Sequence, residues 1–254
     1  MSNALQALAE YVLALADNEL ILAHRDSEWT GHAPILEEDI AFTNIALDEM
    51  GHASVWYSVH ASLVGADPES YPDQLVFQRD VADFRCVPLV ELPNGDWAFS
   101  MLRQYLFDVA EKARLESLLS SGYPSMAQAA AKIRTEEAYH VRHTRAWVIR
   151  LGHGTAESKR RMQLALDSLW PYALGLFEPL DAEAEAVEAG LAPASGELRQ
   201  AWESETRTAL DAAGLAAPNV SEPVMGNRRG HTDHLAPLLT ELQSVARADP
   251  LAAW

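Results

Sequence analysis

Two short segments of the sequence share the pattern Glu-x-x-His, namely "EMGH" at Glu49 and His52 and "EAYH" at Glu137 and His140. Side chains three residues apart lie on the same face of an α-helix, so each pair could reach one point together. Carboxylate oxygen and imidazole nitrogen are ligands that iron and manganese accept. A single copy carries little weight, since chance supplies on the order of one in a chain of this composition.

Both copies lie on the row of apolar residues that should face a core. Steps of three and four along a helix define this row. In the first segment the row is Phe42, Ile45, Glu49, His52, Trp56, Val59 and Leu63. In the second it is Met126, Ala130, Ile133, Glu137, His140, Thr144, Trp147 and Leu151. Polar groups in the middle of two such rows call for a partner inside the protein.

Two further helical segments place an acid on their apolar rows. Glu19 follows Leu8, Val12 and Leu15, and Asp108 follows Ala98, Met101 and Tyr105. Glu19 precedes Glu49 by 30 residues, and Asp108 precedes Glu137 by 29 residues. The near-equal spacing indicates two helical hairpins, each supplying an acid and then Glu-x-x-His. Glu111 is the alternative to Asp108, but it lies one position off the row.

Burying an isolated carboxylate costs several kcal/mol even after the protein relaxes. Lys112 is the one basic residue close to these rows, so a divalent metal is the better partner. One acid from each of two helices, with Glu-x-x-His from each of two others, is the ligand pattern of ferritin-like di-metal bundles. The predicted metal ligands are therefore Glu19, Glu49, His52, Asp108, Glu137 and His140.

The rest of the sequence predicts an all-α protein, a ferritin-like helical bundle with additional helices. Helical periodicity dominates, and we expect core helices over residues 3–26, 35–65, 96–120 and 124–151 in one domain, 1–254. Residues 66–97 are the most irregular stretch. Gly152 is the expected stop of the helix over 124–151. His231 and His234 in "HTDH" are expected at a helix start, on the surface.

Composition narrows the class of function. The formal net charge is −18, which disfavours nucleic acid and anionic membranes as partners. No run of 18 apolar residues is present, so no membrane span is expected. The N-terminus, with Glu10, Asp17 and Glu19, lacks the basic region of a signal peptide. Cys86 is the single cysteine, which excludes an internal disulfide and favours a cytoplasmic setting.

Four longer segments carry a resemblance to a known family. They are "NELILAHRDSEWTGHAP", "QRDVADFRCVPLVELPNGDWAFSMLRQYLFD", "EAYHVRHTRAWVIRLGHGT" and "GHTDHLAPLLTELQSVARADPLAAW". Together they resemble the C subunits of bacterial ring-1,2-phenylacetyl-CoA epoxidase, a phenylacetate-CoA oxygenase with ferritin-like subunits. The similarity runs over essentially the whole chain.

The resemblance implies a role in aerobic phenylacetate catabolism. A catalytic A subunit would carry the di-iron centre and would be the direct partner. A reductase subunit would pass electrons from NADPH, O2 would be consumed, and the substrate would be a CoA thioester. C subunits of this family are regarded as structural, and members can lack the ligand set. This sequence retains all six ligand positions.

Three functions follow as alternatives. The chain could support the A subunit while retaining a di-metal ligand set, it could be a di-iron oxygenase itself, or it could bind or oxidise metal as other ferritin-like proteins do. Iron is the expected metal in each case, with manganese as the alternative. The sequence also leaves open a homodimer when the chain is alone.

Overall fold

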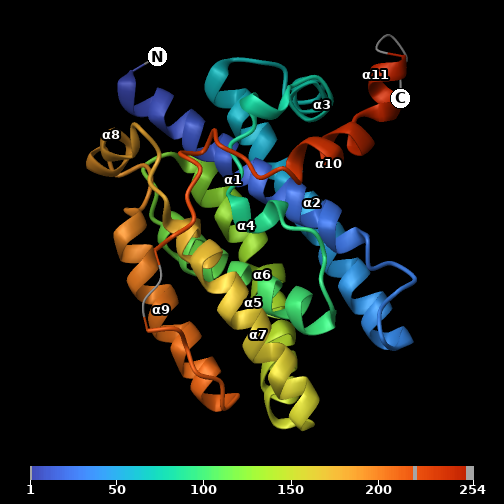
Figure 1. Ribbon diagram of the computed structural model, residues 1–254. Helices are drawn as coiled ribbons and strands as arrows, with labels where there is room; N and C mark the ends of the chain where they lie inside the picture. Colours follow the sequence, from blue (N-terminus) through green and yellow to red (C-terminus); the bar gives the residue numbers. More distant parts are fainter. Residues whose placement is uncertain (1, 220–221, 250–254) are drawn as a thin grey trace.

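The computed structural model describes residues 2–219 and 222–249 (Figure 1). The last five residues of the C-terminal segment quoted above lie outside this range. Every regular element in the described range is a helix, as the sequence predicted. Four are long, α1 (Asn3–Ser27), α2 (Leu36–Val64), α5 (Trp97–Leu118) and α6 (Pro124–His153). The others are α3 (Tyr71–Phe77), η1 (Val81–Asp83), α4 (Pro88–Glu91), α7 (Ala156–Leu174), η2 (Gly175–Phe177), α8 (Glu183–Glu188), α9 (Ser195–Ala212), α10 (Leu235–Leu242) and α11 (Ser244–Ala248).

The four long helices form two hairpins. Short connections join α1 to α2 and α5 to α6, and the helices of each hairpin pack along their length (Figure 1). Contacts between α2 and α6 bring the hairpins together, while α7 and α9 pack on the outside of α5. This is the bundle arrangement expected for long helices with short links. No helix in the described part of the chain has the length and apolar content needed to cross a bilayer.

Local sequence signals set the ends of these helices. The Ser2 hydroxyl accepts the Leu5 N–H at the start of α1, and the Asp96 carboxylate accepts the Phe99 N–H at the start of α5, at 3.0 Å. Such caps satisfy backbone donors that have no partner within the helix. Gly65 ends α2 in the left-handed conformation, with φ of 72°. The four long helices therefore begin and end within about two residues of their predicted bounds.

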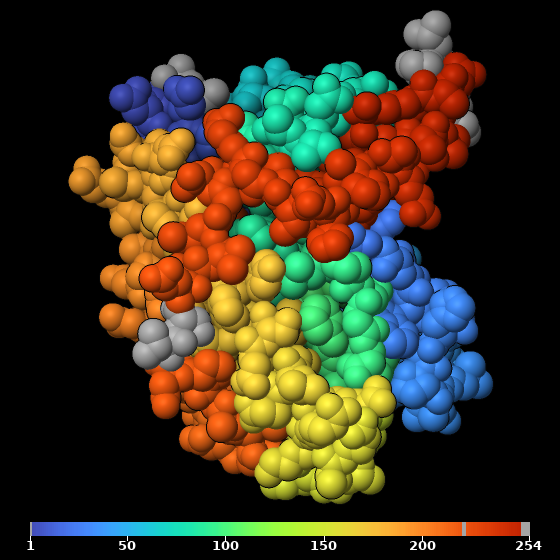
Figure 2. Space-filling model, viewed as in Figure 1, coloured from blue at the N-terminus to red at the C-terminus, as the bar shows by residue number. Residues whose placement is uncertain are grey.

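The irregular stretch between the hairpins is covered by the C-terminal part of the chain. In Figure 2 the orange-red C-terminal segment lies across the face where α3, η1 and α4 are found. The buried Gln243 amide donates to the backbone carbonyls of Val76 and Arg79, at 2.9 and 3.0 Å. These bonds join two segments that are far apart in the sequence. They hold the irregular stretch between the hairpins in one conformation, although it forms only short helices.

Gly152 does not end α6, and the expectation from sequence was wrong on this point. The helix continues to His153, and Gly152 is buried where the end of α9 approaches. A Cβ atom at this position would lie 2.3 Å from the Ala213 carbonyl oxygen and 3.0 Å from the Ala213 Cβ. The glycine is therefore required by a close approach of two backbone segments that are distant in the sequence.

We expect Gly152→Ala to destabilise the protein by about 1–3 kcal/mol, because the methyl group would push α6 away from Ala213. Urea unfolding followed by circular dichroism measures the change. Gly196→Ala is the matched control: Gly196 is exposed in the first turn of α9, and its added methyl meets no atom within 4 Å. It should change stability by less than ~1 kcal/mol, in the stabilising direction. Equal effects of the two substitutions would contradict the close-approach explanation.

Candidate metal centre

The six predicted ligands all lie inside the bundle. Their relative exposures are 0 or 1 %, although each side chain is polar or charged. Each of the four long helices contributes to the cluster: α1 carries Glu19, α2 carries Glu49 and His52, α5 carries Asp108, and α6 carries Glu137 and His140. The two hairpins therefore direct equivalent sets of side chains into one interior region.

The cluster has two overlapping parts. Potential ligand atoms of Glu19, Glu49 and His52 lie within 4.8 Å of one another, and so do those of Glu49, Asp108 and His140. Glu49 belongs to both sets, and the imidazole rings of His52 and His140 have centroids 5.8 Å apart. We call these sets the first and the second position; Glu137 joins the second, with its Oε2 3.5 Å from the His140 Nδ1.

Many polar atoms of the cluster are buried without a hydrogen bond. Within residues 2–219 and 222–249, atoms of five of the six side chains lack any hydrogen-bond partner. They are Glu19 Oε2, Glu49 Oε2, His52 Nδ1, Glu137 Oε1 and Oε2, and His140 Nδ1. Buried polar atoms are normally satisfied, so a group of six such atoms indicates a missing partner. Four carboxylates and two imidazoles fit a pair of divalent cations in charge and in ligand type.

The outer nitrogen of each histidine is bound by an acid from the opposite hairpin. His52 on α2 has its Nε2 2.9 Å from Glu136 Oε2 on α6, and His140 on α6 has its Nε2 3.2 Å from Asp48 Oδ2 on α2. When the Nε2–H donates to these carboxylates, Nδ1 is the ring nitrogen that faces the cluster and is available to a metal ion. This is how histidine ligands are commonly oriented for metal binding.

The Gln104 amide and the Thr144 hydroxyl hold Asp108. Gln104, one turn before Asp108 on α5, donates from Nε2 to Asp108 Oδ1 and to Glu49 Oε1, both at 2.8 Å. The Thr144 hydroxyl lies one turn beyond His140 on α6 and donates to Asp108 Oδ2 at 2.8 Å. Both oxygens of Asp108 therefore accept a hydrogen bond, whereas neither oxygen of Glu137 does.

Burial and mutual repulsion govern the charges of the cluster. Burial raises the pKa of Glu19 and Asp108 well above the usual range, and Glu49 and Glu137 respectively add repulsion. Burial also acts to raise the pKa of Glu49, but its close polar contacts with Glu19 and the two histidines hold this pKa well below its ordinary value. Glu19 and Asp108 are therefore easier to protonate than a surface carboxylate.

Glu111 does not face the cluster formed by the six predicted ligands. It is buried on α5, but its carboxylate pairs with the guanidinium of Arg114 one turn later. Lys112 also points elsewhere, to Glu205 on α9 at 2.8 Å. Asp108, and not Glu111, lies beside Glu49 and His140, so the structure favours Asp108 as the acid of α5.

Sequence reasoning missed Asp48, Glu136 and Gln104. A signal for the first two was present, because each directly precedes the glutamate of its Glu-x-x-His motif. Their side chains are partly exposed, at 37 and 48 %, so the core-row pattern did not select them. Gln104 lies between Met101 and Asp108 on the buried face, but an amide alone does not indicate a ligand.

The expectation that His231 lies on the surface was wrong, whereas His234 is exposed as expected. The His231 side chain is 4 % exposed, and its Nδ1 lies 2.7 Å from Glu91 Oε1. The other oxygen of Glu91 accepts the Thr232 N–H at 2.6 Å, and the Cys86 Sγ is 3.5 Å from Oε1. The buried Glu91 therefore binds the segment before α10 to α4. This contact explains why the His231 side chain is buried.

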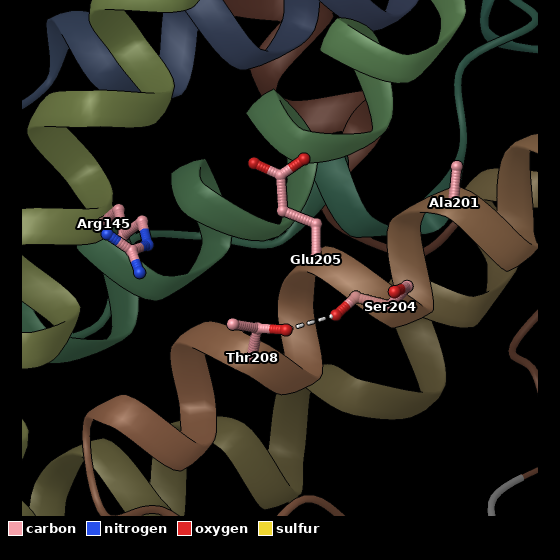
Figure 3. Close-up of a pocket in the computed structure, with 5 residues that line it drawn as sticks. All are labelled: Arg145, Ala201, Ser204, Glu205 and Thr208. Atoms are coloured by element: carbon pink, nitrogen blue, oxygen red, sulfur yellow. Dashed lines mark hydrogen bonds between the residues drawn. The ribbon is translucent and has the colours of Figure 1, made fainter.

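A surface pocket lies between α6 and α9 (Figure 3). Its volume is about 520 Å³, and it is lined by Arg145, Ala201, Ser204, Glu205 and Thr208. None of these residues is one of the six, and all of them except Arg145 lie on α9. The pocket is therefore separate from the candidate metal centre.

Comparison with known proteins supports both the fold and the relationship. A solved Synechococcus protein, described as having aldehyde deformylating oxidase activity, superimposes with a TM-score of 0.58 and 16% sequence identity. The match covers 85% of this chain and 94% of that one, and shows that the two share the ferritin-like fold.

Sequence similarity gives the family. The chain is 40% identical over 248 residues to the C subunit of 1,2-phenylacetyl-CoA epoxidase from Escherichia coli K12, covering 97% of this chain and 99% of the relative. It is 24% identical over 209 residues to the A subunit of the same epoxidase, covering 80% of this chain and 66% of that relative. The family model described as phenylacetic acid catabolic protein matches residues 1–254. The chain therefore belongs to this family, and is homologous to the C and A subunits of phenylacetyl-CoA epoxidase.

Proposed function

We propose that this chain is a subunit of a phenylacetyl-CoA epoxidase, which pairs with the A subunit in the cytoplasm and supports its activity on a CoA thioester. The observation that carries this proposal is the 40% identity to the E. coli C subunit over almost the whole length of both chains. The weaker similarity to the A subunit suits partners that arose from one ancestor. A reductase subunit would act through the A subunit.

We further propose that the chain binds two metal ions through its own six-residue cluster, with iron as the first candidate and manganese as the second. The support is the set of unpartnered carboxylate and imidazole atoms in a buried region. Bound iron would supply redox chemistry toward O2. The protein's own residues would bind the ions, orient the two imidazoles through Asp48 and Glu136, and exclude bulk water by burial.

A second candidate function is oxygenation by this chain itself. The complete ligand set favours it, because a purely structural subunit has no need of six buried polar side chains. Metal storage or oxidation, without a CoA thioester, is the third possibility. The second and third functions require the metal centre, whereas the first requires the A subunit.

The test of the first function is reconstitution. The chain and its A subunit should co-purify when expressed together, and epoxidation of phenylacetyl-CoA with the reductase should require the A subunit. Epoxidation by this chain and the reductase alone would show that this chain is itself the catalytic subunit. Failure to associate with the A subunit would contradict the proposed role.

We expect protein produced in iron-rich medium to contain about two metal ions per chain. Glu49→Ala should lose most of this metal, because Glu49 contributes to both positions. Elemental analysis of the purified protein measures both values. Less than ~0.2 metal ions per chain in the wild type, or an unchanged content in the variant, would contradict the metal assignment.

Glu137→Gln should separate the stability of the metal-free protein from metal binding. Both Glu137 carboxylate oxygens are buried without a partner in the described structure. The neutral amide relieves repulsion and should stabilise the metal-free protein by roughly 1–3 kcal/mol, while the rise in unfolding temperature on metal addition is lost. Chemical and thermal unfolding with and without metal measure these effects.

Glu111→Gln is the control for that substitution. It removes the same charge from the buried interior, but it leaves the buried Arg114 guanidinium without its counter-charge. This variant should be destabilised by about 3–5 kcal/mol and should still gain stability on metal addition. A loss of the metal effect in Glu111→Gln would show that Glu111 is a ligand.

A further inference from the structure

The first and second positions differ in how many of their carboxylate oxygens already accept hydrogen bonds. In the first, Glu19 Oε2, Glu49 Oε2 and His52 Nδ1 have no hydrogen-bond partner among the described residues. In the second, His140 Nδ1 and both oxygens of Glu137 are likewise without a partner. However, Asp108 accepts hydrogen bonds on both oxygens, and Glu49 Oε1, which faces His140, accepts one from Gln104. The difference is local, since the two hairpins are otherwise similar.

The amino group of Gln104 donates two of these three hydrogen bonds, and the Thr144 hydroxyl donates the third. The Gln104 amino group lies 2.8 Å from Glu49 Oε1 and 2.8 Å from Asp108 Oδ1, so one hydrogen-bond donor joins two carboxylates from different helices. A cation in the second position would be attracted to the same two oxygens. The amino group carries a partial positive charge and therefore attracts the two carboxylates. A bound cation would attract them more strongly.

The carbonyl oxygen of the Gln104 side chain shows that this orientation has an energetic cost. Gln104 is fully buried, and in the part of the chain that the structure describes its Oε1 has no hydrogen-bond partner. A buried unsatisfied acceptor is unfavourable. The orientation is retained because the two carboxylates attract the amino group. A cation that binds these carboxylates would therefore allow the Gln104 amide to adopt another orientation.

We propose that Gln104 makes the two metal positions unequal, so that the first position fills first and the second fills only when the amide releases Glu49 and Asp108. This inference starts from the proposed metal centre and adds an order of filling to it. Gln104 acts as a positioning residue, because it touches the ligands and not the reacting groups. It thereby sets a threshold of metal concentration for the complete centre.

Calorimetric titration with Mn2+ tests the order, since Mn2+ uses the same ligands as iron and is stable in air. We expect two steps in the wild type, with dissociation constants at least about tenfold apart. Gln104→Met keeps the length of the side chain and removes the donor. In this variant the second step should tighten at least about fivefold, while the first stays within about twofold. Gln104→Leu serves the same purpose if the longer side chain packs poorly.

Two variants control for indirect effects. Gln243→Met removes a buried amide that donates two bonds to backbone carbonyls far from the cluster, and should titrate like the wild type. Thr144→Val frees Asp108 Oδ2 alone, and it should tighten the second step by less than Gln104→Met does, because Gln104 still holds Glu49 and Asp108 Oδ1. Equal tightening in Thr144→Val and Gln104→Met would overturn the specific role of the amide.

The outcomes also separate this inference from the metal centre itself. Two Mn2+ ions bound with equal affinity in the wild type would overturn the order of filling and leave the centre intact. A weaker second step in Gln104→Met would likewise overturn it. No Mn2+ binding in wild type and variants, all folded by circular dichroism, would overturn the centre together with the inference.

Discussion

The interior of this bundle depends on one electrostatic constraint: four carboxylates share a buried region without a cationic side chain. Glu19, Glu49, Asp108 and Glu137 form no ion pair with lysine or arginine among the described residues, and the two histidines are their nearest basic neighbours. Without compensation such a cluster would drive the helices apart. Protonation, the contacts with His52 and His140, and the proposed metal ions are the ways in which the fold can tolerate it.

The four long helices satisfy this constraint because their apolar rows surround it. Residues such as Phe42, Trp56 and Tyr105 are fully buried beside the polar positions and exclude solvent. In such surroundings each unsatisfied atom is more unfavourable than it would be at the surface. The same burial therefore both destabilises the metal-free protein and strengthens the attraction for a cation. The instability of the metal-free cluster and its proposed affinity for metal would have the same physical origin.

The pattern of residues predicted much of this arrangement. The helical periodicity and the acids on apolar rows were sufficient to locate the four long helices and to bring Glu19, Glu49 and Asp108 into one region. Whether the six side chains hold metal stays a prediction. Gly152 and His231 were misjudged because their environment is made by Ala213 and Glu91, which are distant in sequence. Gln104 was missed because its importance depends on two bonds that only coordinates reveal.

The crossed contacts of the histidines have an evolutionary consequence. Because Asp48 orients His140 and Glu136 orients His52, neither hairpin contains a complete half-site. A descendant that lost the turn of α2 with Asp48, Glu49 and His52 would also leave His140 without its supporting carboxylate. Decay of the centre within this family should therefore proceed in both halves together, and an isolated hairpin would make a poor ancestor for the intact bundle.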